Sequence, residues 1–152
     1  MNSIKGKFAL VTGGTQGLGA AIAKNFADSG AEGIVTIGRK ENKGNEVAKK
    51  IQDETGCKVI FVKTDLGEVQ ECRNAVSVAK QEFGRLDVLV NAAGITDRGD
   101  IVNTSEELFD KMIGTNLKGP YFLIQETVKI MSEQNIEGSI INIGSVAAMT
   151  GQ

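Results

Sequence analysis

The sequence predicts an α/β fold in which parallel strands form one doubly wound sheet with helices on both faces. Five short apolar runs alternate with longer segments whose apolar residues recur at helical spacing. The runs are apolar almost throughout, which is typical of strands that are buried on both faces. Strands that alternate with helices of this length are joined by right-handed crossovers and therefore lie parallel. We expect residues 1–152 to form one domain, long enough to bury a core.

The expected elements follow one another along the chain, and glycines mark several helix ends. Strands are expected at residues 8–12, 33–37, 58–63, 86–90 and 138–144. Helices are expected at residues 17–29, 42–55 and 68–83, and from residue 104 to about residue 134. The first three helices are expected to end at Gly30, Gly56 and Gly84.

The last of these helices carries a start signal and a signal for an irregularity. Thr104 is followed three residues later by Glu107, which is the pattern of a capping box. Pro120 lies inside the helical pattern and lacks a backbone donor. We therefore expect a local irregularity between Asn116 and Pro120.

The turn after the first strand is the most informative segment. Residues 12–19 read Thr-Gly-Gly-Thr-Gln-Gly-Leu-Gly and lead into a helical pattern. Glycine tolerates positive φ and lets a ligand approach the backbone closely, and a helix N-terminus attracts a pyrophosphate. A glycine cluster can also be no more than a tight turn, but the strand and helix around it favour a dinucleotide. The candidate cofactor-binding residues in this turn are Gly13, Gly14, Thr15, Gln16, Gly17, Leu18 and Gly19.

The end of the second strand predicts which nicotinamide cofactor is bound. An Asp or Glu at this place would accept hydrogen bonds from the ribose hydroxyls and repel a 2′-phosphate. This chain instead has Arg39, followed by Lys40, and a guanidinium can bond a phosphate through two N–H groups. We therefore expect NADP, with Arg39 at its 2′-phosphate. Two alternatives remain open, namely a solvated basic loop and an inward turn of Glu41 that would serve NAD.

The next two strand ends carry further candidates, because the carboxyl ends of parallel strands meet at one edge of the sheet. Asp65 suits a hydrogen bond to the adenine amino group, and Leu66 suits contact with the adenine ring. Asp65 also suits the cap of the next helix, because Glu68 stands three residues later. The fourth strand leads into small residues that let the backbone pass close to a ribose, namely Asn91, Ala92, Ala93 and Gly94.

Composition and charge argue against several classes of function. The net charge of −2 offers no general attraction for nucleic acid or anionic membranes. No apolar run approaches membrane-spanning length, and the first residues lack the apolar stretch of a signal peptide. The chain has no histidine, which excludes imidazole catalysis and His-containing metal sites, and we expect no metal. Cys57 and Cys72 are expected as reduced thiols, which favours a cytoplasmic protein.

The motifs agree in order and spacing with one family. Residues 12–19 resemble the TGxxxGxG signature of the short-chain dehydrogenases/reductases, and residues 91–94 resemble their NNAG motif, with Ala92 in place of the second asparagine. Asn116 and Ser145 match the asparagine and the serine of the family's active site. The resemblance covers the whole chain, which is similar to 3-oxoacyl carrier-protein reductases and related sugar or polyol dehydrogenases.

The resemblance implies a Rossmann-like fold and hydride transfer between a nicotinamide and a small carbonyl or secondary alcohol substrate. It makes Asn116 and Ser145 candidate catalytic residues. Ser145 would hold the carbonyl oxygen of the substrate, and Asn116 would hold a water of the proton relay. The resemblance also implies a homo-oligomer, a dimer or tetramer formed through the long helix at residues 105–134.

The resemblance further implies residues that this sequence does not contain. The family's proton donor is a tyrosine followed four residues later by a lysine, shortly after the serine, but only residues 146–152 follow Ser145. The single tyrosine, Tyr121, precedes the serine, has Gln125 four residues later, and is expected to pack on the long helix. We therefore expect an N-terminal portion that is inactive by itself. The alternative is a truncated, non-catalytic nucleotide-binding domain.

The same resemblance makes an expectation about the sheet. Two further strands of the family would be missing after the fifth strand, which leaves an open edge at residues 139–143. An open edge presents unpaired N–H and C=O groups and favours pairing with another chain.

Overall fold

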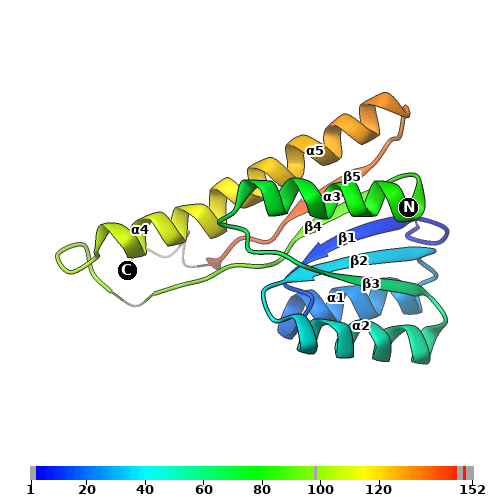
Figure 1. The fold of residues 1–152 in the computed structure, drawn as a ribbon, viewed down its shortest axis with the longest axis horizontal. Coiled ribbons are helices and arrows are strands. Elements are labelled where there is room, and N and C mark those ends of the chain that lie inside the picture. The colour runs from blue at the N-terminus through cyan, green and yellow to red at the C-terminus, as the bar shows by residue number, and fades with distance from the viewer. Residues whose placement is uncertain (1–2, 98, 147–148, 150–152) are drawn as a thin grey trace.

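Five strands form one parallel sheet in the order β3-β2-β1-β4-β5, which confirms the predicted doubly wound fold (Figure 1). The computed structural model describes residues 3–97, 99–146 and 149. The chain adds β2 and β3 on one side of β1 and then crosses over to add β4 and β5 on the other side. The winding therefore reverses between β1 and β4. The strands are β1 (Phe8–Thr12), β2 (Gly33–Gly38), β3 (Lys58–Lys63), β4 (Val88–Asn91) and β5 (Ser139–Asn142).

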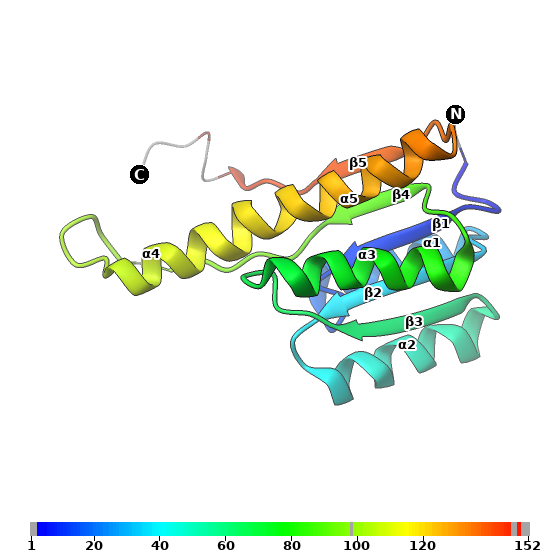
Figure 2. The ribbon, with the colours of Figure 1, turned by 45° about the horizontal axis from the view of Figure 1, so that its top comes forward.

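Helices cover both faces of this sheet. The helical elements are α1 (Gly17–Asp28), α2 (Glu41–Thr55), α3 (Val69–Phe83), α4 (Glu106–Ile113), the π-helix η1 (Gly114–Lys118) and α5 (Gly119–Glu133). The first two, α1 and α2, lie on one face, while α3 and α5 lie on the other (Figures 1 and 2). The helical segment from α4 to α5 is continuous, and its α4 end projects beyond the sheet (Figure 2).

Two clusters of buried apolar side chains hold these layers together, one on each face of the sheet. Successive side chains of a strand point to opposite faces. Leu10 and Leu89 therefore pack against α3 and α5, whereas Val11 and Val90 pack against α1 and α2. All four side chains are buried. The apolar character of β1 and β4 thus reflects burial on both faces, as the sequence predicts.

The long helix is interrupted where the sequence predicts an irregularity. Residues Gly114–Lys118 form a π-helical turn, in which the N–H of Gly119 donates to the carbonyl of Gly114. Pro120 lacks an N–H and cannot donate to the carbonyl of Asn116, so a regular α-helix cannot continue through this point. Such π-turns inside α-helices are frequent at functional sites.

The start of the long helix differs from the expectation by one residue. Ser105 caps α4, and its Oγ accepts a hydrogen bond from the N–H of Leu108 at 3.2 Å. The Thr104 hydroxyl is already engaged, since it donates to the carbonyl of Asp100 at 2.6 Å. The predicted capping box of Thr104 and Glu107 is therefore wrong, because the preceding loop uses the threonine.

The glycines end helices as predicted, but Asp65 does not cap the start of a helix as predicted. Gly56 and Gly84 end α2 and α3 in the left-handed conformation, with φ of +75° and +74°. Helix α3 begins at Val69 after the N-cap residue Glu68, whose side chain makes no cap hydrogen bond. The Asp65 carboxylate instead accepts from the N–H of Gly67 at 2.9 Å, so its predicted capping role is wrong.

Strand β5 forms an edge of the described sheet and pairs with β4. It spans Ser139–Asn142 and is shorter than the predicted 138–144. Ile140 packs against the core on the α5 side, but Ile141 is 41% exposed beside Val88 on the opposite face. The pairing of this edge with another chain stays a prediction.

Candidate cofactor site

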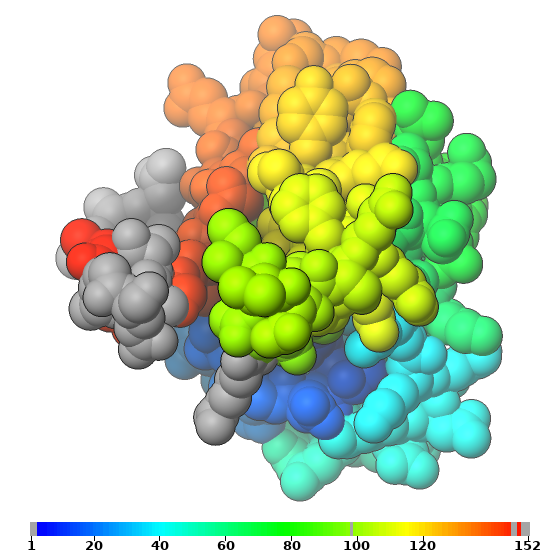
Figure 3. All heavy atoms as spheres, turned by 90° about the vertical axis from the view of Figure 1, so that its left-hand side faces the viewer, coloured from blue at the N-terminus to red at the C-terminus, as the bar shows by residue number. Residues whose placement is uncertain are grey.

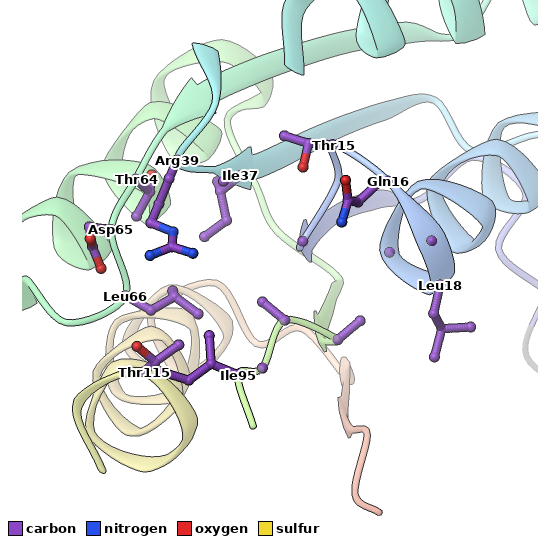
Figure 4. Close-up of a pocket in the computed structure, with 17 residues that line it drawn as sticks. Thr15, Gln16, Leu18, Ile37, Arg39, Thr64, Asp65, Leu66, Ile95 and Thr115 are labelled. Carbon is purple, nitrogen blue, oxygen red and sulfur yellow. The ribbon is translucent and has the colours of Figure 1, made fainter. Parts of the chain in front are cut away.

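An open cavity of about 280 Å³ lies at the carboxyl ends of the strands, where the winding reverses (Figure 4). Ligands bind at this place in doubly wound sheets. The walls come from the turns after β1 and β4, the ends of β2 and β3, and the π-helix η1. All the predicted cofactor-binding residues except Gly14 and Asn91 line it, namely Gly13, Thr15, Gln16, Gly17, Leu18, Gly19, Arg39, Asp65, Leu66, Ala92, Ala93 and Gly94.

The glycine turn presents bare backbone to this cavity. Gly13 and Gly17 have φ of +74° and +57°, a conformation that favours glycine. Gly19 is so close to the turn that a Cβ on it would stand 2.5 Å from the carbonyl oxygen of Gly13. Gln16 is the N-cap residue of α1 and makes no cap hydrogen bond with its side chain. The N–H groups at this helix start are therefore suited to an anion.

Gly14, which is also predicted to bind the cofactor, does not line the cavity. It faces β2, where an added Cβ would overlap the side chain of Thr36. Its N–H donates to the carbonyl of Ile37 at 3.1 Å. Gly14 thus allows the turn to lie against β2, a tertiary contact that the local sequence does not reveal.

Arg39 extends from the end of β2 into the cavity. Figure 4 shows its guanidinium among Ile37, Asp65 and Leu66. Within the described part of the chain, no carboxylate lies within ion-pair distance of Arg39. Its charge is therefore available to a ligand. Glu41, the alternative partner for a ribose, is the exposed first residue of α2 and does not line the cavity.

Leu66 lies in the wall across the cavity from the glycine turn (Figure 4). It is 6% exposed and is supported from behind by α5, since a Cβ on Gly119 would stand 2.8 Å from its Cβ. The Cys72 thiol donates to the carbonyl of Leu66 at 3.7 Å. Burial raises the pKa of Cys72 to about 11, so this group stays a protonated thiol.

One hydroxyl joins the two turns that face the cavity. Oγ1 of Thr12 accepts hydrogen bonds from the N–H groups of Ala92 and Ala93, at 2.9 and 2.8 Å. Thr12 is fully buried. Thr12 was not among the predicted site residues. It could have been found as a polar side chain at the end of a buried strand.

Asn91 lies behind the cavity and not in its wall. Its Nδ2 donates to Oδ1 of Asn142 at 2.9 Å, which joins the ends of β4 and β5. Oδ1 of Asn91 is buried and has no hydrogen-bond partner among the residues that the structure describes. The side chain of Asn91 thus joins the two strand ends, and the contact of this residue with the cofactor stays a prediction.

Asn116 ties the π-helix to the turn after β4. Its Oδ1 accepts from the N–H of Ile95 at 2.9 Å, and its Nδ2 donates to the carbonyl of Ile95 at 2.8 Å. The preceding residue, Thr115, lines the cavity (Figure 4). The π-turn therefore places two consecutive residues at the site, one in its wall and one on its supporting loop.

The other candidate catalytic residue lies farther along the chain. Ser145 follows β5, is exposed and does not line the described cavity. Tyr121 is 60% exposed on α5, where it contacts the ring of Phe122 edge-on with centroids 5.3 Å apart. Its packing is therefore with a neighbour on its own helix and not with the core.

Several lining residues were not predicted. Ile37, Gly38 and Thr64 could have been found from the expected strands, because they lie at or just after a predicted strand end. Ile95 directly follows the predicted residue Gly94. Thr115 precedes the predicted residue Asn116 but follows no strand, and it reaches the cavity through the packing of η1 against distant loops. The unpredicted residues are Ile37, Gly38, Thr64, Ile95 and Thr115.

The sheet order and the cavity at its switch point define a Rossmann-like α/β protein. The family model described as short chain dehydrogenase matches residues 7–152. This chain belongs to the short chain dehydrogenase family, as the resemblance of its motifs predicts.

Individual relatives agree with this assignment. The chain is 36% identical over 147 residues to an uncharacterized oxidoreductase of Staphylococcus saprophyticus, covering 97% of this chain and 62% of that protein. It is 36% identical over 152 residues to a 3-oxoacyl-[acyl-carrier-protein] reductase of Chlamydia muridarum, covering 99% of this chain and 60% of that protein.

A solved structure agrees as well. The crystal structure of a short chain dehydrogenase from Burkholderia cenocepacia J2315 in complex with NADP superimposes with a TM-score of 0.89 at 31% identity. The match covers 99% of this chain and 60% of that one. The chain thus spans about three fifths of the length of the curated relatives it matches.

Proposed function

We propose that this chain binds NADP and belongs to an enzyme that transfers a hydride between the nicotinamide and a small carbonyl or secondary alcohol substrate. The observation that carries the proposal is the pairing of a bare glycine turn with Arg39 in one cavity at the switch point. NADP in the complex of the Burkholderia relative supports it.

The residues of the cavity fit such a dinucleotide. A Cβ on Gly19 would stand 2.5 Å from the carbonyl oxygen of Gly13, so glycine lets the start of α1 lie against the turn, and the N–H groups of this helix start suit a pyrophosphate. The unpaired guanidinium of Arg39 suits a 2′-phosphate, and Leu66 offers an apolar surface to an adenine ring. When bound, the nicotinamide supplies or accepts the hydride.

Asn116 and Ser145 are proposed to act on the substrate side. The amide of Asn116 fixes the turn at Ile95, and each of its polar atoms retains the capacity for one more hydrogen bond. We propose that this capacity holds the relay water. Ser145, exposed after β5, would hold the carbonyl oxygen through its hydroxyl.

One observation favours a second candidate function, a nucleotide-binding domain without catalysis. Tyr121, the only tyrosine in the 152 residues, does not line the cavity and is not followed by a lysine four residues later. Among the residues that the structure describes, no tyrosine lines the cavity as a proton donor.

The test separates cofactor binding from turnover. Isothermal titration of the chain with NADP⁺ and NAD⁺ is expected to show tighter binding of NADP⁺. Oxidation of NADPH is then followed at its absorbance band with small ketones and β-ketoesters. Turnover supports the enzyme over the non-catalytic domain, and no nucleotide binding overturns both. Binding without turnover supports cofactor binding alone, because an N-terminal portion of the enzyme and a non-catalytic domain would both give it.

We also propose self-association through the long helix. Exposed apolar side chains recur along α4, η1 and α5, mostly at four-residue spacing, which brings them to one face. Figure 3 looks onto the end of the molecule where these elements, yellow-green to orange, form a continuous surface. The residues are Phe109, Ile113, Leu117, Tyr121 and Val128, between 41% and 63% exposed. A second copy of the chain is the partner that we propose.

We propose a cytoplasmic location as well. Cys57 and Cys72 are both free and buried, which suits a reducing compartment. In the part of the chain that the structure describes, no helix has the length and apolar character needed to span a membrane. The net charge of −2 supports small molecules, and not nucleic acid, as partners.

A further inference from the structure

A second cation lies beside the segment that carries Arg39. The ammonium Nζ of Lys43, in the first turn of α2, donates to Oε1 of Gln16 at 2.7 Å. Gln16 lines the cavity, and its side chain makes no cap hydrogen bond at the start of α1. The bond between Lys43 and Gln16 thus joins the start of α2 to the glycine turn.

The two segments that this bond joins are also in direct contact. A Cβ on Gly38 would stand 3.0 Å from Cγ2 of Thr15, so the end of β2 lies against the glycine turn. Arg39 follows Gly38 and enters the same cavity (Figure 4). Arg39 and Lys43 therefore both come from the segment that links β2 to α2. Arg39 lines the cavity itself, whereas Lys43 contacts Gln16, which lines it.

The contact with Gln16 holds the ammonium of Lys43 without neutralising it. Lys49 and Lys50, on the same helix, lie 2.6 and 3.9 Å from carboxylates. Lys43 has a neutral amide as its recorded partner, and no carboxylate of the described residues lies within ion-pair distance of it. The helix dipole disfavours a cation in the first turn of a helix. An anion bound here would be attracted both by the ammonium of Lys43 and by the partial positive charge of the helix N-terminus.

We propose that Lys43 is a specificity-determining residue for the 2′-phosphate of NADP, and that Gln16 is the residue that positions it. This inference rests on the proposed function. The Lys43 ammonium adds a point charge to the planar guanidinium of Arg39. Because NAD has no 2′-phosphate, the contribution of Lys43 is to selectivity and not to dinucleotide binding in general.

The experiment is isothermal titration of the full chain with NADP⁺ and with NAD⁺. The variants are Lys43→Gln, Lys43→Arg, Gln16→Ala, the double variant Lys43→Gln/Gln16→Ala, the reference variant Arg39→Gln, and the matched control Lys50→Gln. Lys50 is exposed on the same helix, and its substitution removes the same charge outside the cavity.

Lys43→Gln is expected to weaken NADP⁺ binding by about ten- to a hundredfold, the scale of one hydrogen bond to a charged group, and to leave NAD⁺ binding unchanged. Lys43→Arg retains the preference for NADP⁺, and Lys50→Gln changes neither affinity. Gln16→Ala lowers the preference by a smaller factor. The double variant loses no more of the preference than Lys43→Gln, because Gln16 acts on the phosphate through Lys43.

The outcomes separate this inference from the proposed function. If Lys43→Gln leaves the NADP⁺ preference intact, or weakens both cofactors equally, while Arg39→Gln abolishes the preference, the inference alone is overturned. If the wild-type chain shows no preference for NADP⁺, or binds neither cofactor, the proposed function fails and the inference with it.

Discussion

At the scale of single residues, buried polar groups fix the backbone at both ends of the sheet, Thr12 beside the cavity and Asp87 at the opposite end. The hydroxyl of Thr12 accepts from two successive N–H groups of the turn after β4. Asp87, 1% exposed, accepts from the N–H of Phe8 at 2.9 Å and from Nε of Arg85 at 3.1 Å. A buried N–H without an acceptor is costly, so these acceptors fix the backbone as well as stabilise it.

Thr12→Val tests the first of these groups. The substitution keeps the shape of the side chain but leaves the N–H groups of Ala92 and Ala93 without their acceptor. We expect a loss of about 1–3 kcal/mol in the free energy of unfolding, measured by denaturant titration. Thr12→Ser keeps the hydroxyl and is the control, so equal losses in both variants would contradict this account.

The pH dependence of stability tests the role of the Asp87 carboxylate. Burial raises the pKa of the Asp87 carboxyl, but the Arg85 hydrogen bond, the Phe8 N–H and the charges of Arg85 and Lys7 outweigh it, so the pKa lies below its ordinary value. A carboxyl with a lowered folded pKa stabilises the fold above its unfolded pKa and loses this contribution as the pH falls through the folded pKa. Acid unfolding of Asp87→Asn should therefore lack part of the steep loss of stability that the wild type shows below about pH 4. Identical acid profiles would count against this role.

At the scale of elements, close contacts between a helix and a loop shape the side of the cavity that Leu66 forms. Helix α5 begins at Gly119, where an added Cβ would overlap the carbonyl oxygen of Leu66. The same helical segment carries the π-turn that places Thr115 and Asn116. The position of α5 against the loop between β3 and α3 thus decides the width of the site.

Gly119→Ala is expected to displace α5 from Leu66 and to lower the free energy of unfolding by about 1–3 kcal/mol, the usual cost of overpacking. Nucleotide affinity should fall with it, measured by titration. Gly114→Ala is the matched control on the same segment, since its Cβ would make only an ordinary contact at 3.5 Å with Gly67. If Gly119→Ala changed neither the free energy of unfolding nor the nucleotide affinity, the loop between β3 and α3 could move away at no cost, which would contradict this account.

At the scale of the whole molecule, two surfaces of the described chain lack partners that their composition favours. One is the apolar face of α4, η1 and α5, and the other is the edge of the sheet at β5. An open strand edge presents unpaired N–H and C=O groups, and a contiguous exposed apolar face favours a partner. We therefore expect both surfaces to associate with another polypeptide chain.

Leu117→Glu tests association through the helical face. Leu117 is 63% exposed near the middle of that face, and a carboxylate there would have to be desolvated in the contact. We expect a dimer or tetramer in the wild type and at least a tenfold weaker association in the variant, about 1.4 kcal/mol, measured by sedimentation. Ser77→Glu adds the same charge to the exposed side of α3 and should leave the association unchanged. A monomeric wild type would refute the proposal.

The sequence by itself determined the strand and helix order, the parallel sheet and most of the cavity wall. Local signals suffice for these features, because apolar runs, helical spacing and glycine turns act over a few residues. The irregularity before Pro120 belongs here too, since a missing N–H breaks a helix wherever the helix lies.

Only the tertiary structure decided what each polar or small residue contacts. Gly14 packs on Thr36, Asn91 bonds Asn142, and Asp65 serves its own loop and not the helix cap. Thr12 and Thr115 reach the site through partners far away in the sequence. Such contacts depend on how strands and helices pack, and a hydrogen bond across 51 or 80 residues leaves no periodic trace in the chain.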